Sequence, residues 1–186
     1  MSARPLVAVL LGTDHHPFTR LTGWAAEVRR VTGADVFVQH GATPLPADLD
    51  GAPMLGVRDL DALLRRATVV TTHGGPGLIM EARAAGHLPV VVPRDPARGE
   101  HVDDHQLRFV ARIARTGLVA AATDVPAYRR AVAAGLVAGR TDRRTSGAPA
   151  VPGLPGDPGA AVPGGPTGPT AAERFGVLVD QLVRRA

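Results

Sequence analysis

The sequence predicts an α/β fold, a Rossmann-like doubly wound sheet that is mainly parallel. Short aliphatic runs of strand length alternate with amphipathic stretches of helix length along the chain. Polar or glycine-rich loops separate several of these runs, and the 186 residues suffice for one ordinary domain of this class. Because aromatic residues make up only 3% of the chain, the core must be built mainly from Ala, Val and Leu.

The first strand and helix are marked by proline and glycine at their ends. Leu6–Leu11 is an aliphatic run between Pro5 and Gly12, as expected of a buried parallel strand. Pro17 opens a stretch in which apolar residues recur at spacings of three and four, and this helix is predicted to end near Gly33.

The middle of the chain continues the alternation. β-Branched residues favour strands, whereas glycine and proline stop the elements that precede them. The predicted elements, in order, are a strand at Asp35–Gln39, a possible strand at Met54–Val57, a helix at Asp59–Arg66, a strand at Thr68–Thr72, a helix from Pro76 to about Ala85 and a strand at Leu88–Val92.

Two more units follow a polar loop. Asp103–Arg115 carries one apolar helical stripe and is stopped by Gly117. Val119–Ala122 is a predicted strand, and Val125 to about Ala138 is the helix that follows it.

The composition changes near the C-terminal end. Fourteen of the 24 residues from Gly147 to Thr170 are Gly or Pro, which predicts a disordered linker. An apolar stripe beyond it, including Phe175 and Leu182, predicts an amphipathic helix that packs back on the domain; the alternative is docking on a partner. We therefore expect a domain at 1–146, a linker at 147–170 and a helix at 171–186.

Composition excludes several classes of activity. Cysteine is absent, which excludes disulfides, zinc–thiolate sites, iron–sulfur clusters and a thiol nucleophile. The two serines, Ser2 and Ser146, lie outside the predicted elements, which argues against a serine nucleophile. All 21 basic residues are arginine, but the net charge is only +4 and aromatics for base stacking are scarce, so we do not expect nucleic-acid binding. Apolar runs are far shorter than the roughly 20 residues of a membrane helix, so we expect a cytoplasmic protein.

A glycine-rich loop, residues 71–77, joins a predicted strand to a predicted helix. Ligands bind at the carboxyl ends of parallel strands, and a helix N-terminus attracts anions. We interpret the loop as a site for a phosphorylated ligand such as a nucleoside diphosphate; the alternative is a tight turn without a ligand. Glu81 lies four residues past Gly77, on the same helical face, where it could accept hydrogen bonds from ribose hydroxyls.

A second polar cluster, residues 100–106, opens a later helix. Asp104, His105 and Gln106 would face the same edge of the sheet and could read sugar hydroxyls. One alternative is helix capping by Asp103 and Asp104 with exposed histidines. Another is metal binding, because His101 and His105 are four residues apart beside Asp104.

A third polar cluster, residues 12–18, follows the first strand. His15 or His16 could act as a general base, because histidine titrates near neutral pH. Either could equally be an exposed loop residue. Three polar loops at one sheet edge predict a single cleft.

Together these motifs resemble the C-terminal, donor-binding domain of family 28 glycosyltransferases over roughly residues 6 to 122. The motifs that carry the resemblance are Gly12–Phe18, Thr72–Gly77 with Glu81, Val92–Arg94 and Gly99–Gln106. Gly12–Phe18, with Arg20 and Leu21 after it, resembles the opening of the stand-alone members, which are similar to the catalytic subunits of two-component bacterial polysaccharide transferases.

The resemblance implies one half of a GT-B fold and a metal-independent, inverting hexosyl transfer from a UDP-sugar to a lipid-linked acceptor, in polysaccharide or glycolipid biosynthesis. It implies no cofactor and no metal ligand. The acceptor half is missing, so it also implies a membrane-associated partner subunit that keeps the protein at the inner face of the cell membrane.

Carried over by position, the loop of His73, Gly74, Gly75 and Gly77 would hold the diphosphate. Gly12 and Thr13 would lie beside the phosphates, Glu81 would bind the ribose, and Asp104, His105 and Gln106 would contact the donor sugar. Leu78 departs from the pattern, because many relatives carry Ser or Thr there.

Two rival functions remain open at this point. One is a nucleotide-sugar-binding module without catalysis. The other is a metal-dependent hydrolase that uses His73, His101, Asp104 and His105.

Overall fold

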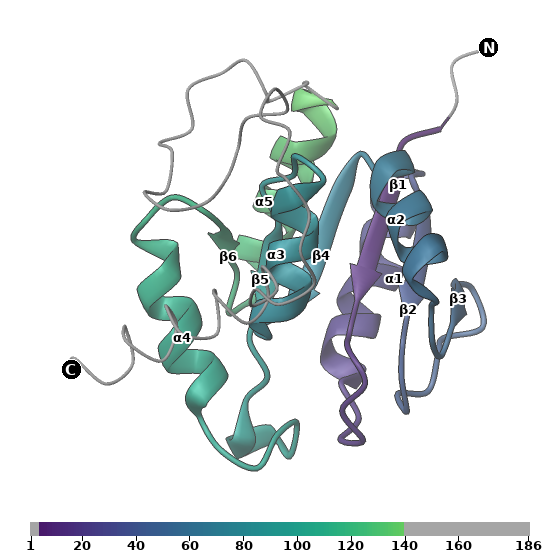
Figure 1. Ribbon diagram of the computed structural model, residues 1–186. Coiled ribbons are helices and arrows are strands. Elements are labelled where there is room, and N and C mark those ends of the chain that lie inside the picture. The colour runs from purple at the N-terminus through teal and green to yellow at the C-terminus, as the bar shows by residue number, and fades with distance from the viewer. Residues whose placement is uncertain (1–3, 140–186) are drawn as a thin grey trace, which may run out of the picture. The chain divides into compact units, whose positions relative to one another are not determined.

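Parallel strands form one sheet in the order β3-β2-β1-β4-β5-β6 (Figure 1). The computed structural model describes residues 4–139. The strands in this part of the chain are β1 (Leu6–Leu10), β2 (Asp35–Gln39), β3 (Asp50–Ala52), β4 (Val69–His73), β5 (Val90–Val92) and β6 (Ala120–Ala121). This strand order confirms the predicted Rossmann-like, doubly wound sheet.

Consecutive strands along the chain are joined through a helix, except β2 and β3, which are joined by a loop. The helices are α1 (Thr19–Thr32), α2 (Val57–Arg66), α3 (Pro76–Ala84), α4 (His105–Ala114) and α5 (Val125–Ala138), with a short 3-10 turn, η1 (Pro96–Arg98). Within residues 4–139, no helix is both long enough and apolar enough to cross a lipid bilayer.

Alternate residues of β1 feed two cores on opposite faces of the sheet. Val7 and Val9 pack in the core that includes apolar residues of α1 and α5. Ala8 and Leu10 pack in the core that includes residues of α2 and α3. All four side chains are completely buried. Burial on both faces explains why the strand is a continuous aliphatic run and not an alternating one.

The predicted third strand at Met54–Val57 is wrong. The strand is Asp50–Ala52, which pairs with Phe37–Gln39 of β2. Its backbone fits closely there, since a Cβ on Gly51 would lie 2.3 Å from the carbonyl oxygen of Val38. A short edge strand that is held by backbone hydrogen bonds needs no hydrophobic pattern, so the sequence does not reveal it. The apolar Met54, which suggested a strand, is instead 63% exposed.

The other elements match the prediction within a few residues at each end, and the 3-10 turn was not predicted. Gly33 and Gly86, expected to stop helices, both adopt positive φ, the left-handed conformation that glycine tolerates best. The predicted linker at 147–170 and helix at 171–186 lie outside the described residues.

Two helical glycines test the packing of α5 on the sheet. A Cβ on Gly135 would lie 2.7 Å from Cγ2 of Val69, a stiff and buried side chain, whereas a Cβ on Gly23 in α1 meets nothing within 4 Å. We expect Gly135→Ala to lower the free energy of unfolding by about 1–2 kcal/mol, because overpacking outweighs the gain in helix propensity. Gly23→Ala should raise it by up to about 1 kcal/mol. Urea unfolding followed by circular dichroism measures both, and equal effects of the two substitutions would contradict the packing.

Candidate functional site

A pocket opens at the carboxyl ends of β1 and β4, where the strand order reverses. Ligands of open α/β sheets bind at this position. The pocket has a volume of about 590 Å³, within the range of small-molecule sites. Its lining residues are Gly12, Thr13, Asp14, Gln39, Met54, Leu55, Leu60, His73, Gly75, Gly77, Leu78, His101, His105 and Gln106. The predicted single cleft is therefore present.

The ring of His73, at the end of β4, is enclosed by two glycines. A Cβ on Gly12 would lie 2.6 Å from Nε2 of this ring, and a Cβ on Gly75 would lie 2.0 Å from its Cε1. Gly12 also has a φ of +77°. These glycines are thus required by close packing on the histidine, in addition to any approach of a ligand.

His73 is held in one tautomer and in its neutral form. Its Nδ1 accepts a hydrogen bond from the backbone N–H of Gly75 at 3.0 Å, so the ring proton resides on Nε2. Burial, together with the nearby positive charge of Arg94, lowers the pKa of His73 from its ordinary 6.5 to about 4. At neutral pH the side chain offers a neutral N–H donor at the pocket.

Two buried carboxamides fix the loops around this histidine. Gln106 Oε1 accepts hydrogen bonds from the backbone N–H groups of Gly74 and Arg94, at 3.0 and 3.2 Å. Gln39 donates to the carbonyl of Gly12 and accepts from its N–H, both at 3.0 Å. The Gly74 and Gly75 amides are thus engaged within the protein. The amides of Gly77 and Leu78 belong to the first turn of α3, where helix geometry supplies no acceptor, and both residues line the pocket.

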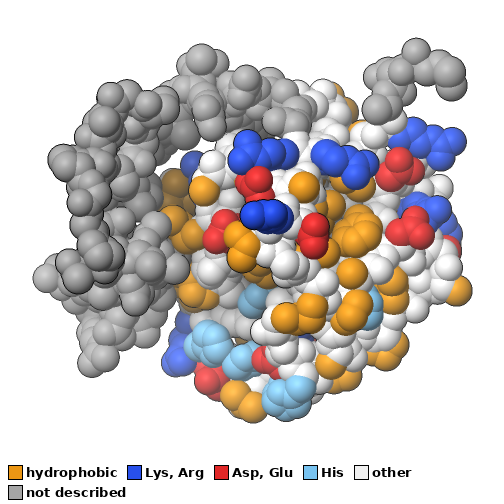
Figure 2. All heavy atoms as spheres, turned by 45° about the vertical axis from the view of Figure 1, so that its right-hand side comes forward, with side chains coloured by type: hydrophobic (Ala, Val, Ile, Leu, Met, Phe, Trp, Pro, Cys, Tyr) orange, Lys and Arg blue, Asp and Glu red, His pale blue; other side chains and the backbone are white. Residues whose placement is uncertain are grey.

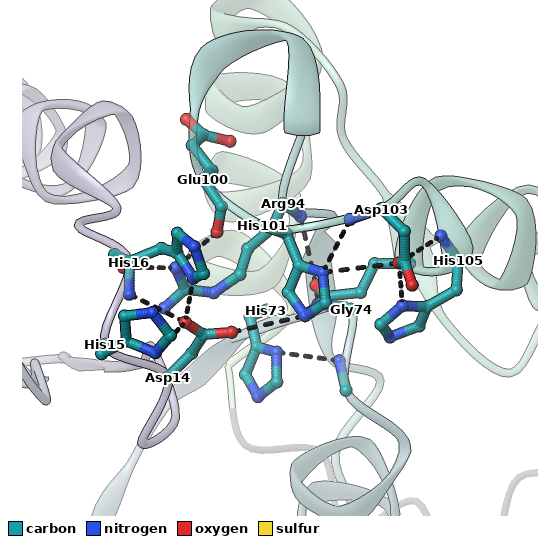
Figure 3. Close-up of polar contacts among 12 residues, drawn as sticks. Asp14, His15, His16, His73, Gly74, Arg94, Glu100, His101, Asp103 and His105 are labelled. Atoms are coloured by element: carbon teal, nitrogen blue, oxygen red, sulfur yellow. Dashed lines mark hydrogen bonds and ion pairs between the residues drawn. The ribbon is translucent and has the colours of Figure 1, made fainter.

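Arg94, which follows β5, is completely buried and ties three segments together (Figure 3). Its guanidinium donates to the carbonyls of Leu11, His16 and Glu100, at 2.9, 2.7 and 3.0 Å. It also lies 4.7 Å from the centre of the Phe18 ring. Burial lowers the pKa of this guanidinium. The sequence analysis assigned no separate role to Arg94. The only feature that could have pointed to its burial is its position directly after a buried strand and Pro93.

Asp14 organises the histidines of the loop between β1 and α1. Its Oδ1 accepts from the His16 backbone N–H at 2.8 Å and lies 2.7 Å from His16 Nδ1. Its Oδ2 lies 3.3 Å from His101 Nε2. Burial alone would raise the pKa of Asp14, but the hydrogen bonds from His16 and the charges of Arg94 and His16 lower it to about 2. Asp14 was not among the predicted site residues.

A second ion pair supports the same loops from behind. Arg20 of α1 donates to both carboxylate oxygens of Glu100, at 2.8 and 2.7 Å, and to the carbonyl of Pro93 at 2.8 Å. The two side chains are 13% and 5% exposed. A bidentate pair of this kind fixes the relative orientation of its two side chains as well as their distance. It therefore holds α1 and the loop after β5 in a fixed relative position.

The structure brings many of the predicted site residues to the pocket wall and leaves others outside it. Those at the wall are Gly12, Thr13, His73, Gly75, Gly77, His105 and Gln106, whereas Gly74 is buried against Gln106. Glu81 is exposed on α3 and is not a lining residue. Asp104 is exposed and pairs with Arg108 at 3.1 Å. The side chain of His15 is 85% exposed, whereas that of His16 is 23% exposed and paired with Asp14.

Histidines gather along one edge of the molecular face in Figure 2, together with acidic and apolar side chains. His101 groups with Asp103 and His105, and not with Asp104. The residue set named for a hydrolase is therefore not assembled as such, because Asp104 faces Arg108.

The comparisons with known proteins identify a family for most of this domain. The family described as "Glycosyltransferase family 28 C-terminal domain" matches residues 25–129, more than half of the chain. No curated protein matches the chain in sequence.

The chain is similar to several solved structures, and with two glycosyltransferases it shares the fold. The calicheamicin glycosyltransferase is 22% identical with a TM-score of 0.54, over 70% of this chain and 33% of that chain. The glycosyltransferase of kitacinnamycin is 22% identical with a TM-score of 0.52, over 71% of this chain and 34% of that chain. The molybdenum cofactor carrier protein from Chlamydomonas reinhardtii is 18% identical with a TM-score of 0.45, over 73% of this chain and 99% of that chain. The chain spans about a third of the length of the first two, and these likenesses show the fold alone.

Replacing the buried arginine tests its role in holding the loops. Arg94→Met leaves the carbonyls of Leu11, His16 and Glu100 without their donor, so we expect the free energy of unfolding to fall by about 3 kcal/mol. The matched control is Arg98→Met, which removes an exposed pair with Asp95 and should change stability by no more than about 0.5 kcal/mol. Urea unfolding measures the stability of both variants. A loss of similar size in both would show that Arg94 does not hold the loops together.

The low pKa of His73 predicts a pH-dependent stability. The unfolded chain binds a proton below its pKa of 6.5, whereas the folded chain binds one only near 4. Stability should therefore be complete above pH 6.5 and fall toward pH 4, by at most about 1.4 kcal/mol per pH unit. His73→Asn keeps an acceptor for the Gly75 amide and should lose this part of the slope. Urea unfolding at pH 7, 6 and 5 compares the two proteins, and parallel slopes would contradict the assignment.

Proposed function

The chain belongs to the glycosyltransferase family 28 C-terminal domain family, and from that premise we propose that it is the donor-binding subunit of a UDP-sugar-dependent hexosyltransferase. The observation that carries the proposal is the pocket at the switch point, into whose wall the first turn of α3 brings Gly77 and Leu78. Most of the predicted donor-binding residues share that wall.

The diphosphate of the donor would lie at the start of α3. This turn contains no acidic residue, so its positive end keeps its attraction for an anion. Gly77 and Leu78 would donate backbone hydrogen bonds, and His73 would add a neutral N–H. Gly12 and Thr13 would lie beside the phosphates. Fixed dipoles can stabilise a departing UDP without a metal ion, which supports a metal-independent transfer. We propose in addition, from the family resemblance, that the transfer is inverting.

The proposed contacts to the sugar and the ribose follow from where the predicted residues lie on α3 and α4. His105 and Gln106 line the pocket on the side of α4 and would contact the donor sugar, with Asp104 beside them. Glu81 would reach the ribose from α3. Of the two histidines proposed as general base, His16 fits better, because Asp14 holds its Nδ1 and leaves Nε2 to accept a proton from the acceptor hydroxyl.

A partner subunit would complete the enzyme. The chain spans about a third of the length of the glycosyltransferases that share its fold, and the partner would supply the acceptor site. Exposed apolar residues flank the pocket, with Met54 in its lining and Val102, 74% exposed, next to His101. We propose a membrane-associated partner that binds a lipid-linked sugar acceptor, and a role in polysaccharide or glycolipid biosynthesis.

Titration calorimetry of the chain with UDP and ADP tests the proposal. We expect UDP to bind, with and without a chelator, and ADP to bind more weakly. Gly77→Ala adds a methyl group where the protein has open space, so the fold should persist while affinity for UDP falls by about tenfold, or 1.4 kcal/mol.

The control variant is Gly23→Ala, another exposed helical glycine with open space around its Cβ, which should bind UDP like the unchanged chain. Absence of uridine-nucleotide binding would refute the donor site. UDP binding without any transfer in the presence of the partner would favour a non-catalytic nucleotide-sugar-binding module.

A further inference from the structure

A cluster of side chains of the kinds that bind metals lies in the segment that leads into α4, separate in sequence from the first turn of α3 but at the wall of the same pocket. It consists of His101, Asp103 and His105, whose ligand atoms all lie within 4.8 Å of one another (Figure 3). His101 Nδ1 is 3.4 Å from Asp103 Oδ1, and His105 Nδ1 contacts the same oxygen. The two imidazole rings meet edge to face, with centres 4.6 Å apart.

Two imidazoles and one carboxylate form a ligand set suited to divalent transition metals such as Zn²⁺ and Co²⁺. His101 and His105 line the pocket, so remaining coordination positions would face its interior. The side chains of Asp103 and His105 are 54% and 49% exposed, which lets an ion enter from solvent. The same set does not suit Mg²⁺ or Ca²⁺, because those ions prefer oxygen ligands and two of the three ligands here are imidazole nitrogens.

The surroundings of His101 add a second observation. Its Nε2 lies 3.3 Å from Oδ2 of Asp14, and its Nδ1 lies 3.4 Å from Oδ1 of Asp103. This Nδ1 accepts a hydrogen bond from the backbone N–H of Asp103 at 3.3 Å, which a bound ion would replace. A metal-bound histidine commonly donates its other ring N–H to a carboxylate, which orients the ring and strengthens its lone pair. Asp14 would supply that support from a different loop.

The neighbouring group of Asp14, His15 and His16 also meets the distance criterion, but its chemistry is less suitable. Asp14 Oδ1 accepts from the backbone and ring of His16, as Asp103 Oδ1 does from those of His105, so these contacts do not distinguish the two groups. The positive charge of Arg94 does, because it acts on the carboxylate of Asp14 and would repel a cation.

We propose that His101, Asp103 and His105 bind one divalent transition-metal ion at the pocket wall, with Asp14 as the outer carboxylate that orients His101. This site goes beyond the proposed function, which requires no metal.

Titration of the full chain with Co²⁺, followed by visible absorption and then by displacement with Zn²⁺, tests the site. We expect a saturable spectrum at one ion per chain. His105→Ala should weaken Co²⁺ binding by at least about tenfold, because it removes a ligand. His15→Ala removes a more exposed histidine, from the neighbouring group, and should leave the titration unchanged.

Absence of a saturable spectrum in the unchanged chain would overturn the proposal. Loss of binding in His15→Ala with retention in His105→Ala would overturn it as well, by moving the ion to the neighbouring group. The titration contains no nucleotide, so its result stands apart from the calorimetry with UDP.

Discussion

The buried guanidinium of Arg94 is the interaction on which the site depends. It joins the end of β1, the loop before α1 and the loop after β5 through the carbonyls of Leu11, His16 and Glu100. Burying a charge is costly unless it is paired, and the carboxylates of Asp14 and Glu100 provide the opposing charges. Because these loops meet where the strand order reverses, the arginine determines the shape of the pocket floor without being part of its lining.

Packing at this floor also sets the electrostatics of the pocket. Gly12 and Gly75 enclose the ring of His73, and that enclosure, with the charge of Arg94 nearby, keeps the histidine neutral. The same arginine helps to keep Asp14 ionised. The same buried charge therefore adds to the effect of burial that keeps His73 neutral and to the hydrogen bonds from His16 that keep Asp14 ionised. Both effects depend on close contact between loops.

The pocket has two chemically different sides. The first turn of α3 presents backbone N–H groups and no acidic side chain, which suits a phosphate group. Another part of the lining carries His101 and His105, with Asp14 in contact with His101 and with Asp103 in contact with both histidines. A nucleotide-sugar in the proposed site would thus enter with a defined direction, its diphosphate toward α3 and its sugar toward α4. A metal ion on the histidine side would meet the ligand at the end away from the helix dipole.

The elements and their class can be predicted from the chain alone, because local patterns carry that information. The aliphatic run at β1, the β-branched residues of β4 and the glycines after the helices sufficed for a doubly wound sheet, and a shared sheet edge then placed Gly12, His73 and His105 at one pocket. Only the tertiary structure decided β3, which pairs through backbone groups, and the roles of Arg94, Asp14 and Gln39. Arg94 meets Leu11 across 83 positions of sequence, and Gln39 meets Gly12 across 27. Contacts of that separation leave no periodicity in the chain, because they are fixed by which strands become neighbours and not by the residues beside them.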